Sequence, residues 1–168
     1  MLDLTHAAFE TDIPHKPLTI KPFFHVDIPL ETVGMNASYA PAKLPSGKLT
    51  MILTPQADDF KNKMGWLLRD QNNIRFFDRA MFTAISNSNR KVPFEVEITF
   101  HLKTLWKRDE DGPIKIVQDC LFDHFRSLAP KPQNWNDNRV LALHVYKDIT
   151  SSAHVSIEIK VSCTIVGK

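Results

Sequence analysis

The sequence is short of glycine, of cysteine and of long apolar runs. With five glycines in 168 residues, it contains no glycine-rich loop of the kind that cradles phosphate groups. Its two cysteines, Cys120 and Cys163, cannot build a disulfide framework, and no spacing of Cys and His is typical of a zinc site. No apolar run approaches the roughly 18–20 residues of a membrane-spanning helix. The first residues also lack the basic segment and apolar stretch of a secretory signal.

These shortages favour a soluble chain in a reducing compartment. We therefore expect a cytoplasmic protein without membrane association, in which both thiols are reduced and buried. The composition, 43% hydrophobic and 24% charged, is that of a globular domain, and 168 residues suffice for one domain with a real core. We expect residues 1–19 to form a weakly ordered extension and residues 20–168 to form the domain.

The net charge of +2 is small, but its distribution is uneven. Residues 1–33 hold two basic and five acidic residues, so the rest of the chain carries 19 bases and 14 acids. If some of these acids bind a divalent cation, the surface that a polyanion meets is more positive still. Solvated surface lysines explain the same excess, and the charge alone does not favour nucleic-acid binding.

Apolar and polar residues alternate most clearly over residues 94–102, which predicts a strand with one buried face. Further strands are predicted over 20–28, 50–53, 140–147 and 154–166. We expect residues 148–154 to be a hairpin loop that pairs the last two strands.

Two segments have helical periodicity. One begins at Pro55 with Thr54 as its cap and continues, with a break at 69–73, through Ile74 and Phe77 to Ile85. The other begins at Pro113, and its apolar residues recur at spacings of three and four. Residues 29–49 are expected to form a long loop. The predicted fold is α+β, a mixed β-sheet with helices packed on it.

The second helix is preceded by an acidic cluster, Asp109, Glu110 and Asp111. On the helix, Asp111, Lys115 and Asp119 are four residues apart and therefore share one face. Asp137 lies just before the strand at 140–147 and can approach the same point. Carboxylates that converge in this way are suited to Mg²⁺, which takes oxygen ligands and is often completed by substrate phosphates.

A purely structural interpretation accounts for the same residues. Asp111 is a suitable helix N-cap, Lys115 can pair with its helix neighbours, and Asp137 can form an Asx turn. Spacing alone favours this interpretation over a metal site.

A family resemblance favours the metal site instead. The segments RDEDGPIKIVQD, WNDNRV and HVYK followed by HVSIEI resemble the RusA family of Holliday junction resolvases. The resemblance extends over residues 20–166 and includes, less specifically, NASY and KLTMILTPQADDFK. The chain departs from the family pattern at Gly112, where Asn is common, and at Asn136, where the family has a second acid.

The resemblance implies a hydrolase, a Mg²⁺-dependent (or Mn²⁺-dependent) endodeoxyribonuclease that resolves four-way DNA junctions in recombination and repair, leaving 5′-phosphate and 3′-hydroxyl ends. By this resemblance, Asp109, Asp111 and Asp137 are the metal ligands, Lys115 is the catalytic lysine and Asp119 is the supporting helix carboxylate. It also implies a homodimer and a bacterial or phage origin. We expect phosphate contacts from five basic residues: Lys43, Lys48, Lys103, Lys107 and Arg108.

Two alternatives remain open at this point. One is a nuclease of broader specificity for branched DNA, and the other is a junction-binding protein that no longer cleaves. Branch selectivity depends on dimer geometry and loops, which the sequence does not determine.

Overall fold

The computed structural model describes residues 22–31, 39–104 and 111–162, although at 111 and 112 it describes the helix and not the side chains. Its core is a mixed five-stranded sheet with three α-helices around it, so the predicted α+β class is confirmed. The predicted extension at 1–19 lies outside the described residues. In the described part of the chain, no helix is both long and apolar enough to cross a membrane.

The five-stranded sheet has the order β4-β1-β7-β5-β6. Its strands are β1 (Phe24–Ile28), β4 (Ile74–Phe77), β5 (Phe94–Leu102), β6 (Val140–Ile149) and β7 (His154–Val161). All neighbours are antiparallel except β5 and β6, which are parallel. A parallel pair needs a crossover, and α3 (Asp111–Leu128) provides it between β5 and β6.

The prediction that the last two strands form a hairpin is wrong. The chain does turn back between β6 and β7, but β5 lies between these two strands in the sheet. The burial pattern gives the physical reason: every second residue of β5 is buried, as suits a central strand, whereas no residue of β6 is buried. The strand β6 is therefore an edge strand.

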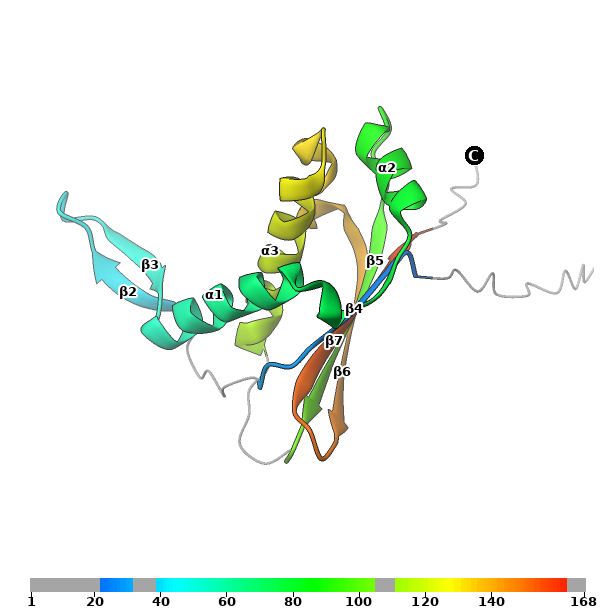
Figure 1. Ribbon diagram of the computed structural model, residues 1–168. Coiled ribbons are helices and arrows are strands. Elements are labelled where there is room, and N and C mark those ends of the chain that lie inside the picture. Colours follow the sequence, from blue (N-terminus) through cyan, green and yellow to red (C-terminus); the bar gives the residue numbers. More distant parts are fainter. Residues whose placement is uncertain (1–21, 32–38, 105–110, 163–168) are drawn as a thin grey trace, which may run out of the picture.

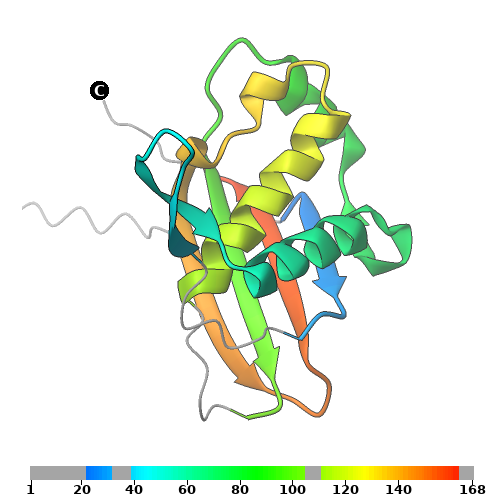
Figure 2. The ribbon, with the colours of Figure 1, turned by 90° about the vertical axis from the view of Figure 1, so that its left-hand side faces the viewer.

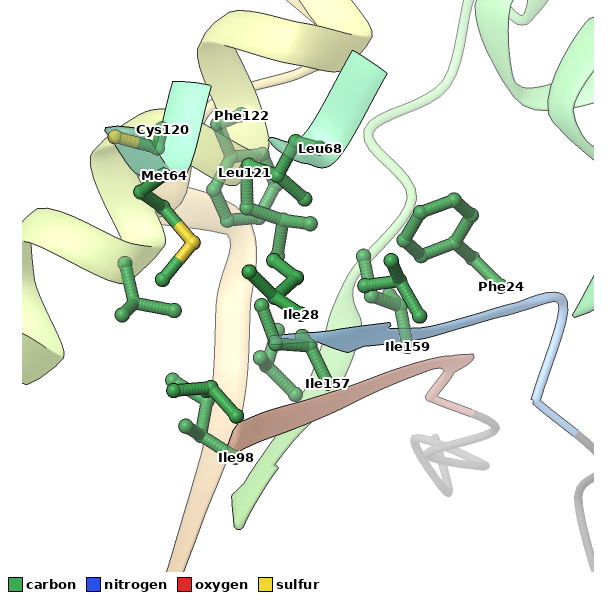
Figure 3. Packing of buried hydrophobic residues seen from close by; sticks show 14 of the residues in the cluster. Phe24, Ile28, Met64, Leu68, Ile98, Cys120, Leu121, Phe122, Ile157 and Ile159 are labelled. Carbon is green, nitrogen blue, oxygen red and sulfur yellow. The ribbon is translucent and has the colours of Figure 1, made fainter. Parts of the chain in front are cut away.

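Two helices cover one face of the sheet. Figures 1 and 2 show α1 (Pro55–Arg69) and α3 lying across it, in contact with each other. Apolar side chains from both helices meet those of the strands in one core, among them Met64, Leu121, Ile98 and Ile157 (Figure 3). The helix α3 begins at Asp111, two residues before the predicted start. Leu128, at the end of its predicted apolar stripe, is exposed.

The helix start at Pro55 is confirmed, because the Thr54 side chain accepts a hydrogen bond from the Ala57 amide. The continuation of helical structure through Ile74 is wrong. After a short 3₁₀ turn, η1 (Gln71–Asn73), residues 74–77 form β4 on the edge of the sheet beside β1. Only then does α2 (Arg79–Asn87) begin, capped by Asp78.

The predicted loop at 29–49 contains a strand. β2 (Tyr39–Lys43) pairs antiparallel with β3 (Leu49–Leu53) in a separate two-stranded sheet that projects away from the rest of the molecule (Figure 1). Gly47 makes the turn with a φ of 80°, a conformation that favours glycine. Prolines and glycines surround this strand in the sequence, and because these residues are typical of loops, the segment was predicted to be a loop.

The predicted state of the first cysteine is confirmed: Cys120 lies in α3 as a buried, free thiol. Burial raises the pKa of this thiol to about 11, so it is protonated and unreactive at neutral pH. Cys163 lies outside the described residues.

Candidate functional site

The candidate site is centred on Lys115, one turn into α3. Its ammonium group donates to Asp119 Oδ1 at 2.8 Å, on the next turn of the helix, and to Asp137 Oδ2 at 2.6 Å. Asp137 is the first residue of a short 3₁₀ helix, η3 (Asp137–Arg139), which leads directly into β6. Three of the predicted site residues, from two separate elements, therefore converge.

The three side chains form a polar cluster on the exposed side of α3. Residues of the opposite side, such as Val117 and Leu121, are fully buried against the sheet. Lys115 remains half exposed, and Asp137 is 38% exposed, so a ligand from solvent can reach both. The ion pairs by themselves stabilise the fold only weakly, because exposed pairs are screened by water.

The close contacts fix the charges of the cluster. Hydrogen bonds to Asp119 and Asp137 raise the pKa of Lys115 above its usual range. The hydrogen bond from Lys115 lowers the pKa of Asp137, and the Asn138 backbone amide contributes in the same direction. At neutral pH the cluster therefore holds one ammonium and an ionised Asp137 carboxylate.

Buried hydrogen bonds anchor the segment that carries Asp137. The two N–H groups of the Asn134 side chain are shared among three carbonyl oxygens at the end of α2, those of Ile85, Ser86 and Ser88, at 2.9–3.1 Å from the amide nitrogen. The Trp135 indole is fully buried among aromatic rings and donates to Ser86 Oγ at 3.0 Å. These contacts hold the chain immediately before Asp137 against the body of the protein.

Sequence reasoning did not identify this anchor. Its signal was present, since Asn134-Trp135 interrupts a polar, proline-containing segment with a large aromatic residue. The Asx turn occurs one residue earlier than predicted: the Asn136 side chain, not that of Asp137, accepts from the Asn138 amide at 3.1 Å.

The remaining predicted site residues lie either outside the described part of the chain or away from this cluster. Asp109, Lys107 and Arg108 lie outside the described residues. Asp111 is the first residue of α3, and its side chain also lies outside the described set. Of the predicted phosphate-contacting residues that are described, Lys43 and Lys48 lie exposed at the outer end of the β2–β3 hairpin, and Lys103 lies exposed just after β5.

The carboxylates around Lys115 are only part of what a Mg²⁺ site requires. Asp119 and Asp137 are carboxylates that already share one cation, the Lys115 ammonium, and oxygen donors of this type suit a hard divalent ion. Within the described ranges, no group of three or more His, Cys, Asp or Glu residues is arranged to hold a metal ion. A metal here would therefore need additional oxygen ligands.

A second polar cluster, not predicted from the sequence, lies on the sheet face opposite the helices. Ser156 donates to Asp27 at 2.7 Å, and His101 Nε2 lies 3.1 Å from Ser156 Oγ. Arg75 also donates to Asp27, at 2.8 Å. Burial alone would raise the pKa of Asp27, but the hydrogen bonds from Arg75 and Ser156 outweigh it and the pKa is lowered. These hydrogen bonds link four neighbouring strands, although Nδ1 of His101 has no hydrogen-bond partner among the described residues.

Comparison with known proteins adds no family assignment. No protein-family model matches the chain, and no curated protein matches it.

Proposed function

We propose that this chain is a metal-dependent endodeoxyribonuclease of the RusA type, which cuts branched DNA and resolves four-way junctions. The observation that carries the proposal is the contact of Lys115 with Asp137, 22 residues away along the chain. It joins two of the segments on which the family resemblance rests. A lysine between exposed carboxylates is an arrangement suited to phosphodiester hydrolysis, because the substrate, the metal and the lysine then meet at one point.

Mg²⁺ or Mn²⁺, when bound, would polarise the scissile phosphate and lower the pKa of the attacking water. Asp137 would hold the ion together with Asp109 and Asp111, the two ligands implied by the resemblance. Asp111 is one turn before Lys115 on α3, so its position along the helix is compatible with this role.

The chain's own residues have distinct tasks. Lys115, permanently charged, would neutralise the negative charge that builds on the phosphate during cleavage. Asp119 would orient the lysine from the next helical turn, at 2.8 Å. With Asp137 holding the ion, Lys115 would keep Asp119 as its partner and could donate to a phosphate oxygen.

A junction with two-fold symmetry is cut in pairs most simply by a symmetric dimer. The edge strand β6 offers a surface through which two copies could pair. β6 is ten residues long and exposes four large apolar side chains, Leu141, Leu143, Tyr146 and Ile149. Long apolar edge strands invite pairing with another chain, because their outer backbone groups are unpaired. We propose that β6 pairs antiparallel with β6 of a second copy.

The sequence of β6 is self-complementary about Tyr146. A two-fold axis at this residue places His144 opposite Asp148 of the partner subunit, and Leu143 opposite Ile149 of the partner subunit. Each pair occurs twice by symmetry. An axis one residue further along, at Lys147, would instead place two like charges opposite each other, which is unfavourable.

The cleavage proposal is tested with a labelled four-way junction, a matched duplex and a flapped duplex, each with and without Mg²⁺. Paired, metal-dependent nicks on opposing strands of the junction, with the duplex intact, are the expected result. Equal cutting of flap and junction would favour the broader nuclease. Junction binding without any cutting would favour the binding protein.

The dimer proposal is tested by light scattering after size exclusion. The wild-type chain should be a dimer, His144→Asp should weaken it by placing two acids opposite each other, and His144→Asp combined with Asp148→His should restore it. Lys63→Asp on α1, distant in sequence from β6, is the control for a change of charge. A wild-type monomer, or a double variant no better than the single one, would contradict the proposed interface.

A further inference from the structure

Beside the candidate site lies a cavity of about 400 Å³, in the size range of roughly 300–1,000 Å³ that is usual for small-molecule sites. Its walls combine two cations, Lys91 and Arg139, with the amide side chains of Asn136 and Asn138. Apolar side chains, including Val92 and Leu141, form the remaining wall. Among the described residues no acidic side chain lines it, so the cavity is suited to an anionic ligand with a flat or apolar part.

The cavity is tied directly to the proposed site of cleavage. Asn136 and Asn138, which line it, are the two neighbours of Asp137 in the chain. Asp137 itself turns to Lys115 instead. A strand whose scissile phosphate lies at Lys115 and Asp137 would therefore pass close to the cavity.

Arg139 carries an unused donor. Its Nη2 donates to the Gln133 carbonyl oxygen at 3.2 Å, which holds the guanidinium in place. Its Nη1 is buried and has no hydrogen-bond partner among the described residues. A buried donor without a partner is costly, by about 1–3 kcal/mol or more for a charged group. The Gln133 contact and this burial hold the guanidinium in one position in the cavity wall.

We propose that this cavity binds one unpaired nucleotide of the DNA strand that is cut. Its phosphate lies against Arg139 and Lys91, and its base lies against the apolar wall with its edge toward the Asn136 and Asn138 amides. This inference rests on the proposed function, because it names the part of a branched substrate that the site selects. A base at a branch point is already partly unstacked, so placing it in a pocket costs less there than in a continuous duplex.

Binding of 5′-deoxymononucleotides, measured by saturation-transfer NMR on the full chain without DNA or Mg²⁺, tests the proposal. The wild type should bind mononucleotides more tightly than inorganic phosphate or the matching nucleoside, because both parts of the cavity contribute. Arg139→Gln should weaken binding by about tenfold or more, which corresponds to the loss of a charge-assisted hydrogen bond. Lys91→Gln should weaken it less, because Lys91 is solvent-exposed.

Arg90→Gln is the matched control, since Arg90 is the neighbouring cation and does not line the cavity. Because Arg139 also supports the fold through Gln133, Leu141→Trp provides a second test that narrows the cavity without removing a charge. Equal affinity for phosphate and nucleotide, or nucleotide binding that survives both Arg139→Gln and Leu141→Trp, would overturn the proposal.

The outcome is separable from that of the proposed function. Lys115→Ala should leave mononucleotide binding unchanged, because Lys115 is not part of the cavity wall. Nucleotide binding without junction cleavage would refute the nuclease and leave the cavity as assigned. Junction cleavage without nucleotide binding would support the nuclease and refute the assignment of the cavity.

Discussion

Lys115 Nζ lies 2.6 Å from Asp137 Oδ2, and this contact joins the first turns of α3 to the start of β6. Because α3 is the crossover between the parallel strands β5 and β6, the two residues belong to one β-α-β unit. The contact therefore forms within a single supersecondary unit, between the crossover helix and the segment that enters the next strand.

The predicted metal ligands can be tested with near-isosteric substitutions. Asp137→Asn should reduce junction cleavage by about 100-fold, in line with the loss of a group that holds a metal. Asp109→Asn and Asp111→Asn should do the same. Junction binding without metal should persist or strengthen in each variant, because a negative charge that faces phosphate is removed.

Asp123→Asn is the control, since Asp123 lies on α3 but pairs with Arg126 and not with Lys115. Melting temperatures should stay close to that of the wild type in all four variants. Cleavage at the wild-type rate in two of the three ligand variants would show that the metal assignment is wrong.

Lys115→Ala distinguishes a catalytic lysine from a structural ion pair. The catalytic role predicts a large loss of cleavage with metal binding retained, measured by single-turnover kinetics and by calorimetric titration of Mn²⁺. The structural role predicts a stability loss of about 0.2–0.5 kcal/mol and unchanged activity.

Lys63→Ala is a closely matched control, because Lys63 makes the same type of pair, with Asp59 four residues before it, at 2.7 Å on α1. It should lose the same small stability and no activity. A Lys115→Ala rate within about twofold of wild type would favour the structural role.

The anchor of the Asp137 segment can be tested through Asn134, whose side chain is buried against the end of α2. Asn134→Ala leaves the carbonyl groups of Ile85, Ser86 and Ser88 without this donor. It should lower the free energy of unfolding by about 1–3 kcal/mol. Cleavage should fall as well, even at temperatures where the variant is fully folded, because Asp137 is then held less firmly.

Urea unfolding and cleavage assays at low temperature measure both effects. Asn138→Ala serves as the stability control, since this side chain is exposed. An Asn134→Ala variant that is as stable as Asn138→Ala would contradict the anchoring role.

His124 predicts a dependence of stability on pH. It is buried in α3, and burial, followed by the charge of Arg69, lowers the pKa of its imidazole below the usual value of 6.5. Neither ring nitrogen has a hydrogen-bond partner among the described residues. As pH falls below about 6.5, the unfolded chain takes up the proton before the folded protein does, so the free energy of unfolding should decrease.

Urea unfolding at pH 7.5 and pH 5.0 measures this loss. His124→Leu, which removes both ring nitrogens, should lose less stability between the two pH values than the wild type does. An equal loss in the wild type and in His124→Leu would contradict the prediction.

Local sequence determined much of the fold, because short-range periodicity records which face of an element is buried. The alternation over 94–102 became β5, and the spacing of apolar residues after Pro113 became α3. The four-residue spacing of Lys115 and Asp119 likewise produced the expected contact, since residues one helical turn apart are always neighbours.

Tertiary structure decided what local pattern leaves open. Residues 74–77 have helical spacing, but they pair with β1 because the edge of the sheet offers them backbone partners. The turn after β6 suggested a hairpin, yet β7 lies on the far side of β5, where Val155, Ile157 and Ile159 are fully buried. The approach of Asp137 to Lys115 depends on the α3 crossover and on Trp135 in the core. Contacts of this kind arise from the packing of distant segments, and no spacing along the chain encodes them.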